Sequence, residues 1–299
     1  MTEFIAALSD QDFPFIRYAL ITGLLASIPF GIIGTYVVVR RISYIAGAIS
    51  HCILGGIGAG LYMQKEIGIS WFGPLHGAIV VALLAAVTLA LVSFFARQRE
   101  DSVIGALWAA GMAIGLLFMA RTPGYNDPMS YLFGNILLLS GVDMWLVAAL
   151  AIAVVGLVAV FYNYFLAICF DEEFAGLRGV RTHLVYLFLL CLTALTIVLL
   201  VRIVGIVMVI ALLTLPAAIA GNFVRGIKQM MITSILLCSV FITSGLAASY
   251  SMDLPSGPVI ILVAAMVYLV VVVVRKFLPL IVAHRKQNKV EQTVKKSRE

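Results

Sequence analysis

Long apolar runs, each about the length of a membrane-spanning helix, recur along this chain from Phe15 nearly to Ile281. A hydrocarbon core about 30 Å thick takes roughly 20 apolar residues of helix per crossing. The runs are continuous and do not alternate between polar and apolar positions, as the strands of a membrane barrel would. Because backbone groups inside a bilayer must be paired within the protein, helices are the structure that remains.

The runs predict an all-α polytopic integral membrane protein with about nine transmembrane helices. Eight is the alternative count, because the number of crossings around residues 121–142 is open. A basic and polar tail, residues 284–299, follows the transmembrane domain of residues 1–283, and we expect this tail to be disordered. The predicted spans are residues 15–39, 42–63, 72–96, 102–120, 143–167, 184–201, 204–221, 229–250 and 258–275.

The composition fits an embedded chain, since 63% of the 299 residues are hydrophobic and 11% are charged. A soluble domain carries roughly 25% charged residues. No basic residue precedes Arg17 and no small-residue cleavage pattern follows the first run, so we expect no signal peptide. The cysteines lie in or beside apolar spans without paired spacing, which predicts neither disulfides nor a cysteine metal cluster.

The basic residues predict the orientation, because Lys and Arg of short loops are retained on the cytoplasmic side. With the N-terminus outside and the C-terminus in the cytoplasm, the great majority of the 20 basic residues fall inside. The net charge of +6 then follows from topology and from attraction to anionic lipid headgroups. It does not indicate a nucleic-acid partner. The exceptions that fall outside are Arg17, Lys65, Arg121 and Arg202.

His51 is the clearest candidate for chemistry, since an ionisable group at membrane depth is costly. It stands nine residues into the second predicted span, which places it about 14 Å deep. Neutral imidazole binds zinc, copper, iron and nickel, yet a histidine can equally form a hydrogen bond across a helix interface. The small residues on or beside its helical face let another helix or a solute come close: Gly47, Ser50, Cys52 and Gly55.

A second candidate is the charged segment near residues 171–181, which predicts a short helix. Acidic residues favour the N-terminus of a helix, and glycine favours its C-terminal end. The segment is either a simple connector or a helix that docks onto a soluble partner. Its candidate residues are Asp171, Glu172, Glu173, Phe174, Ala175, Leu177, Gly179 and Val180.

The sequence contains no phosphate-binding loop, no zinc-protease motif and no nucleophile elbow. Transport would therefore draw its energy from an ATPase partner or from an ion gradient. An ion-coupled secondary transporter is one alternative, although the sequence offers one intramembrane histidine and no buried acid–lysine pair. A membrane-embedded enzyme is another, although no nucleophile and base lie at one depth.

Several segments, taken in order, resemble the membrane subunit of metal-ion ABC importers, the ABC-3 family of manganese, zinc and iron permeases. Each segment is weak alone, but their order is specific, and the resemblance runs from about Gly31 to Val274. The segments are residues 40–43 leading to Ser50-His51, residues 131–137, residues 170–180, and residues 204–218.

This resemblance implies the permease subunit of an ATP-driven importer of divalent metal ions in the bacterial cytoplasmic (inner) membrane. The expected partners are two cytoplasmic ATP-binding subunits, an extracytoplasmic metal-binding protein, and a second permease chain that makes a homodimer or a heterodimer. The chain itself would be no enzyme and would hold no cofactor, only the transported metal ion. Residues 171–180 would form the coupling helix that docks on the ATPase.

By the same resemblance, His51 corresponds to the family's pore histidine, a gate or transient metal ligand, and Asn135 joins the pore-lining candidates. The family usually has aspartate four residues before this histidine, where this chain has Gly47, and often aspartate at the position of Asn135. Losing the carboxylate beside His51 removes an oxygen ligand. This loss favours a softer ion such as Zn²⁺ over Mn²⁺.

Overall fold

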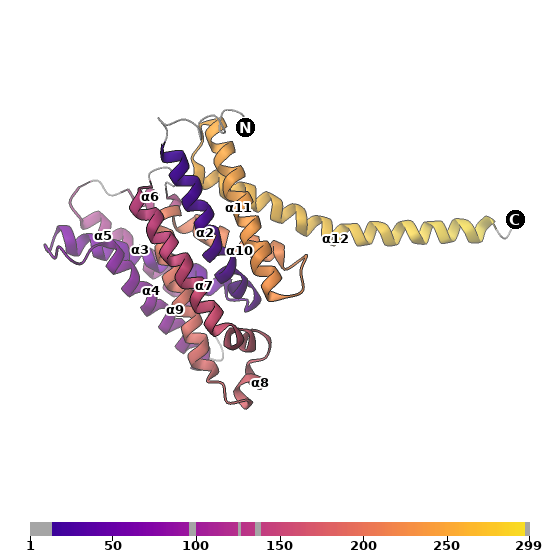
Figure 1. The fold of residues 1–299 in the computed structure, drawn as a ribbon, viewed down its shortest axis with the longest axis horizontal. Helices are drawn as coiled ribbons and strands as arrows, with labels where there is room; N and C mark the ends of the chain where they lie inside the picture. Colours follow the sequence, from indigo (N-terminus) through magenta and orange to yellow (C-terminus); the bar gives the residue numbers. More distant parts are fainter. Residues whose placement is uncertain (1–13, 96–99, 125–126, 135–138, 297–299) are drawn as a thin grey trace.

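In the computed structural model, residues 14–95, 100–124, 127–134 and 139–296 are described, with side chains described as far as Lys276. Every regular element in these residues is an α-helix (Figure 1). The helices are α2 (Pro14–Val39), α3 (Ser43–Lys65), α4 (Pro74–Phe95), α5 (Glu100–Arg121), α6 (Pro128–Phe133), α7 (Gly141–Phe170), α8 (Glu172–Leu177), α9 (Thr182–Val204), α10 (Ile206–Ala220), α11 (Ile227–Met252) and α12 (Ser256–Lys296).

The predicted all-α membrane fold is confirmed. Within the described residues, eight helices are long and apolar enough to cross a membrane. The run predicted at 204–221 forms α10, which has 15 residues and is therefore about 22 Å long. Gly205, with a φ of +83°, separates α10 from α9, and this left-handed backbone conformation suits glycine.

The turns and helix termini around α8 gather at one end of the bundle, which we call the α8 end (Figure 1). The ring of Phe94, at the end of α4, lies 4.4 Å from the ring of His183, at the start of α9. The guanidinium of Arg275 in α12 lies 5.1 Å from the ring centre of Phe223, between α10 and α11. The end of α4 and the start of α9 therefore lie together at this end, and α12 passes beside the α10–α11 turn.

The opposite end, which we call the α6 end, gathers the other connections. A Cβ added to Gly134, which follows α6, would lie 2.6 Å from the backbone nitrogen of Gly205. A Cβ added to Gly257, in the first turn of α12, would lie 2.6 Å from the carbonyl oxygen of Phe133. The backbone of α6 thus rests directly on the α9–α10 break and on α12, with no side chain between them.

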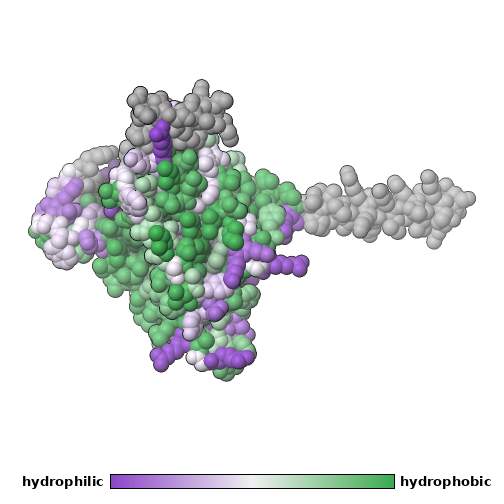
Figure 2. All heavy atoms as spheres, in the orientation of Figure 1, coloured by the Kyte–Doolittle hydropathy of each residue, from purple (hydrophilic) through white to green (hydrophobic). Residues whose placement is uncertain are grey.

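The centre of the bundle is α3. In its most apolar window 89% of the residues are buried, and α4, α5 and α9 pack around it. In α5 and α12 only 17% of the corresponding window is buried. Figure 2 shows the result, a broad hydrophobic surface with hydrophilic residues gathered toward the ends.

The last helix, α12, begins at Ser256 and its backbone is helical to Lys296. The predicted disorder of the tail at 284–299, and the domain boundary before it, stay predictions, since no side chain of this segment is described.

Candidate functional site

His51 lies in the middle of α3 with 8% of its surface exposed. Its imidazole stacks on the indole of Trp108 from α5, with 4.1 Å between ring centres and 20° between ring planes. Its Nδ1 atom is buried and has no hydrogen-bond partner among the described residues. The site is therefore a shielded imidazole held against an aromatic ring from a neighbouring helix.

Gly47, one turn before His51, lies against the same indole. A Cβ added at this position would lie 3.1 Å from Cζ3 of Trp108, which is tighter than ordinary van der Waals contact. The indole therefore occupies the space beside Gly47 into which a side chain would project. Sequence reasoning singled out Gly47 and His51 but not Trp108, which belongs to another span.

Ser50 and Cys52 are both buried, and both are engaged in hydrogen bonds. The Ser50 hydroxyl donates to the carbonyl of Ala46 in its own helix at 2.8 Å. The Cys52 thiol donates to the carbonyl of Leu107 in α5 at 3.2 Å. Cys52 therefore points toward α5, and the role of both residues in lining a pore stays a prediction.

Gly55 also faces α5, because a Cβ added to it would lie 2.9 Å from the carbonyl oxygen of Gly111. Its role as a pore-lining residue likewise stays a prediction. Asn135 lies outside the described residues. No group of three or more His, Cys, Asp or Glu side chains that could hold a metal ion occurs in the described part of the chain.

The segment near 171–181 contains the short helix α8. Asp171 begins it, since its carboxylate accepts a hydrogen bond from the backbone N–H of Phe174 at 2.9 Å. Such a cap satisfies one of the unpaired donors of the first turn. Gly179, with a φ of +82°, follows the helix. The backbone N–H of Val180 returns to the carbonyl of Ala175 at 3.1 Å and closes the turn.

The faces of α8 differ in exposure. Ala175 is buried, with 3% of its surface exposed. Phe174 and Leu177 are 54% and 87% exposed, and Glu173 is exposed as well. Because α8 lies at the tip of the α8 end (Figure 1), these two apolar side chains point away from the bundle.

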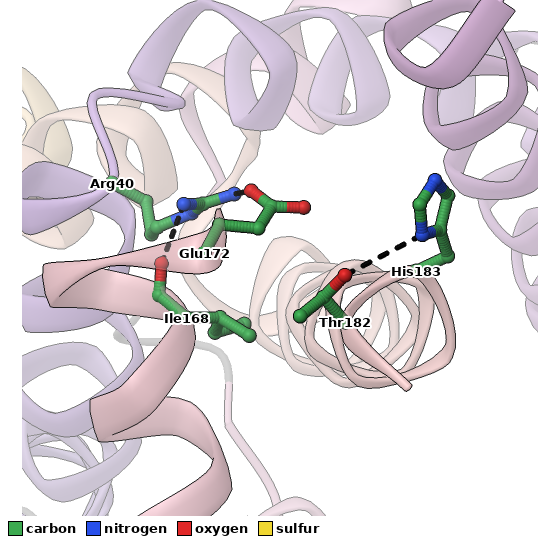
Figure 3. A network of polar contacts seen from close by, with 5 residues as sticks. All are labelled: Arg40, Ile168, Glu172, Thr182 and His183. Atoms are coloured by element: carbon green, nitrogen blue, oxygen red, sulfur yellow. Dashed lines mark hydrogen bonds and ion pairs between the residues drawn. The ribbon is translucent and has the colours of Figure 1, made fainter. Parts of the chain in front are cut away.

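Arg40, at the end of α2, anchors the base of α8 (Figure 3). Its Nη2 atom lies 2.7 Å from Oε2 of Glu172 in an ion pair, and its Nη1 atom donates to the carbonyl of Ile168 at 2.5 Å. The guanidinium also lies 5.1 Å from the ring centre of Tyr186 in α9. One side chain thereby joins the α2–α3 turn to α7, α8 and α9.

A cavity of about 340 Å³ opens toward the α6 end. Ile57 in its wall lies six residues beyond His51, so the cavity begins about 9 Å along α3 from the imidazole. The lining is mainly apolar, with Arg202 and Tyr131 as its polar members. The residues lining it are Ile57, Pro74, Leu75, Ala78, Tyr131, Val198 and Arg202.

A sequence model of the ABC 3 transport family matches residues 12–275. A Chlamydia pneumoniae protein named a probable metal transport system membrane protein is 38% identical, over 91% of this chain and 94% of its own length. The manganese transport system membrane protein MntC of Listeria monocytogenes is 30% identical, over 87% of this chain and 90% of its own length.

Among solved structures, a chain of PsaBC from Streptococcus pneumoniae, solved in complex with a Fab, has the same fold. The two superpose with a TM-score of 0.79 and 29% sequence identity, over 90% of this chain and 94% of that one. The sequence and structure matches therefore span nearly the same, nearly complete length.

Proposed function

The chain belongs to the ABC 3 transport family, and from this premise we propose that it is the membrane-spanning permease subunit of an ATP-driven importer of divalent metal ions. The observation that carries the proposal is α8, which is anchored at its base by Arg40 and exposes Phe174 and Leu177. An exposed apolar pair at the tip of an anchored helix is the kind of surface that docks onto a partner.

The proposed partners are those of such an importer. A cytoplasmic ATP-binding subunit docks on α8 and hydrolyses ATP, so this chain is not itself an enzyme. An extracytoplasmic metal-binding protein delivers the ion to the α6 end, where the cavity beside Arg202 opens. A second permease chain, identical or related, completes the ion path.

In the proposed mechanism, the contacts of Arg40 connect α8 to the ion path. ATP binding at the docked subunits moves α8, and Arg40 passes this movement to the α2–α3 turn and so to α3. The two permease chains then open alternately to either side, and the metal ion passes His51 near the middle of the bilayer. A single imidazole binds such an ion weakly enough to release it, as conduction requires.

The proposed location is the bacterial cytoplasmic membrane, with the α8 end in the cytoplasm and the N-terminus outside. The basic residues support this orientation, because those described at the α8 end outnumber those at the α6 end. The basic residues described at the α8 end are Arg40, Arg41, Arg178, Arg181, Arg225, Lys228, Arg275 and Lys276.

Two observations bear on the identity of the metal, and they favour different ions. The relative MntC is named for manganese transport, which supports Mn²⁺. Gly47 and the ring of Trp108 leave His51 without a neighbouring carboxylate on its helical face, which supports Zn²⁺, an ion that imidazole binds well. Iron is the third ion that importers of this kind carry.

Uptake of radioactive manganese, zinc and iron tests the proposal directly. The chain is produced with the ATP-binding subunit and the metal-binding protein encoded beside it, in bacteria that lack their own importers of these metals. ATP-dependent uptake is expected, and the preferred isotope identifies the ion. His51→Ala is expected to abolish most of the uptake, because it removes the imidazole at the centre of α3.

The matched control is His76→Ala, which removes an exposed histidine near the start of α4 and is expected to leave uptake unchanged. Uptake that survives in His51→Ala would leave the permease assignment intact but reduce His51 to a packing role. No uptake of any of the three metals by a demonstrably assembled complex would overturn the proposal.

A further inference from the structure

Helices α3 and α5 touch backbone to backbone along a seam of glycines. A Cβ added to Gly58 would lie 2.5 Å from the carbonyl oxygen of Gly115, and one added to Gly111 would lie 2.6 Å from Cα of Cys52. Gly55 meets Gly111 in the same way. Because small residues allow membrane helices to approach this closely, the seam fixes the spacing between the two helices.

Trp108 is the large side chain at one end of this seam, one turn before Gly111. Its six-membered ring lies against Gly47, and its ring system stacks on His51. A single indole therefore lies against both Gly47 and His51, which are one turn apart on α3.

The stack has a chemical consequence for His51. It holds the plane of the imidazole, and it covers a face of the ring while both ring nitrogens remain at the edge, where the lone pair that binds a metal lies. Nδ1 has no hydrogen-bond partner among the described residues, although a buried polar atom normally has one. The indole face is also electron-rich and attracts cations.

We propose that Trp108 is the positioning residue of the ion path: it orients the imidazole of His51 for the transported metal ion and offers that ion an aromatic ring beside Gly47. The proposal rests on the proposed function, since the ion is the cargo of the importer. Gly47 is its counterpart, because an aspartate there would place its Cβ against the indole.

The fluorescence of Trp108 tests this proposal without altering the site. The chain has three tryptophans, and the other two, Trp71 and Trp145, are 73% and 72% exposed. In the Trp71→Phe, Trp145→Phe background, Trp108 is the one tryptophan of this chain, and its emission is the difference from the same complex that also carries Trp108→Phe. Titration of the purified complex with the imported metal is expected to change this emission in a saturable way, and His51→Ala is expected to abolish the change.

Transport of the Trp108 variants gives the second measurement. Trp108→Leu keeps an apolar side chain but cannot stack, so we expect the metal concentration for half-maximal uptake to rise about fivefold to tenfold, the effect of losing a desolvated cation–π contact. Trp108→Phe keeps an aromatic face and is expected to stay within about twofold of the parent chain. Uptake is normalised to the amount of assembled complex.

The outcomes separate this proposal from the one on which it rests. A parent chain that imports no metal contradicts the proposed function itself. A parent chain that imports metal, but whose Trp108 emission does not respond or still responds in His51→Ala, overturns the positioning role. So does a Trp108→Leu variant that transports with unchanged concentration dependence. If Trp108→Leu does not assemble, the titration alone decides.

Discussion

Arg40 illustrates how much one side chain contributes at the scale of a residue. It is only partly exposed, and it bonds a carbonyl of α7 and a carboxylate of α8. Hydrogen bonds to charged groups contribute roughly 1.5–3 kcal/mol each. We therefore expect Arg40→Ala to lower the free energy of unfolding by about 2–3 kcal/mol, because the Ile168 carbonyl loses its charged donor. Thermal unfolding of the purified protein in one fixed detergent measures this.

Two variants serve as comparisons. Glu172→Gln keeps a hydrogen-bond acceptor beside Arg40 and loses only a half-exposed ion pair, so its cost is expected to stay below about 1 kcal/mol. Arg41→Ala removes the guanidinium of the neighbouring residue, which is exposed. This change is expected to leave the free energy of unfolding nearly unchanged. Equal midpoints for Arg40→Ala and Arg41→Ala would show that the contacts of Arg40 add no stability.

Among single residues, the sequence identified those that stand out locally. His51 could be found because a histidine within an apolar span is unusual, and Asp171 because an acidic residue beside a glycine-ended segment predicts a helix start. Trp108 could not, because aromatic residues are common in apolar spans and its importance comes from a contact with another helix. The spacing of Gly111 and Gly115 marks the seam, but not which helix lies against it.

At the scale of helices, glycines decide where two backbones can meet. A Cβ on Gly34 in α2 would collide with the carbonyl oxygen of Leu213 in α10. Gly34→Ala is therefore expected to destabilise the protein by about 1–3 kcal/mol, the usual cost of overpacking. Gly156→Ala in α7 is the matched control, since a Cβ there meets no atom within 4 Å.

The control is expected to raise stability by up to about 1 kcal/mol, because alanine favours helix more than glycine does. The thermal midpoints of the two variants, measured side by side, check that Gly34→Ala lowers stability and that Gly156→Ala does not. A Gly34→Ala chain as stable as Gly156→Ala would mean that α2 and α10 can move apart at no cost.

The exposed side of α8 makes a separate prediction. Phe174→Ser and Leu177→Ser together are expected to leave the thermal midpoint of the isolated chain within about 1 °C, because exposed side chains contribute little to folding. The same pair should abolish co-purification with the ATP-binding subunit. Leu254→Ser, a change of a 49% exposed residue near the α6 end, should leave co-purification intact.

The elements themselves were largely predictable, since each of the nine predicted spans corresponds to a helix. Hydrophobic length is a local property of sequence, and it sets where a helix can cross a bilayer. The break between α9 and α10 was also predictable, because the predicted spans 184–201 and 204–221 separate at Arg202. The sequence did not reveal that Gly205 at this break lies against Gly134 of a distant segment.

At the scale of the whole molecule, the two ends of the bundle make the orientation testable. Ser70→Cys lies in the exposed turn between α3 and α4, and Glu173→Cys lies on α8. In intact cells a membrane-impermeant maleimide is expected to label Ser70→Cys and to spare Glu173→Cys until the membrane is permeabilised. The reverse pattern would invert the proposed orientation, and the unmodified chain reports labelling of its own cysteines.

The assembly of the helices was the least predictable level. Among the eight candidate spans, α3 is the least apolar and yet the most buried, whereas α12 is among the most apolar and is hardly buried at all. In a water-soluble protein, the most apolar helices would be the most buried ones. In a bilayer the lipid is the most apolar environment available, so glycine-rich helices such as α3 can fill the interior.

The ion pair between Arg40 and Glu172 connects the position of α8 to the position of His51 in α3. From Glu172 in α8, the path to His51 runs through the ion-paired guanidinium of Arg40, the turn at residues 40–42, and about 12 Å of continuous helix in α3. Because α3 is one continuous helix from this turn to the imidazole, a shift of α8 that displaces Arg40 would also displace His51. Because the glycine seam holds α3 and α5 in close contact, the two helices would move together. Relative motion would then occur between this pair and the other helices.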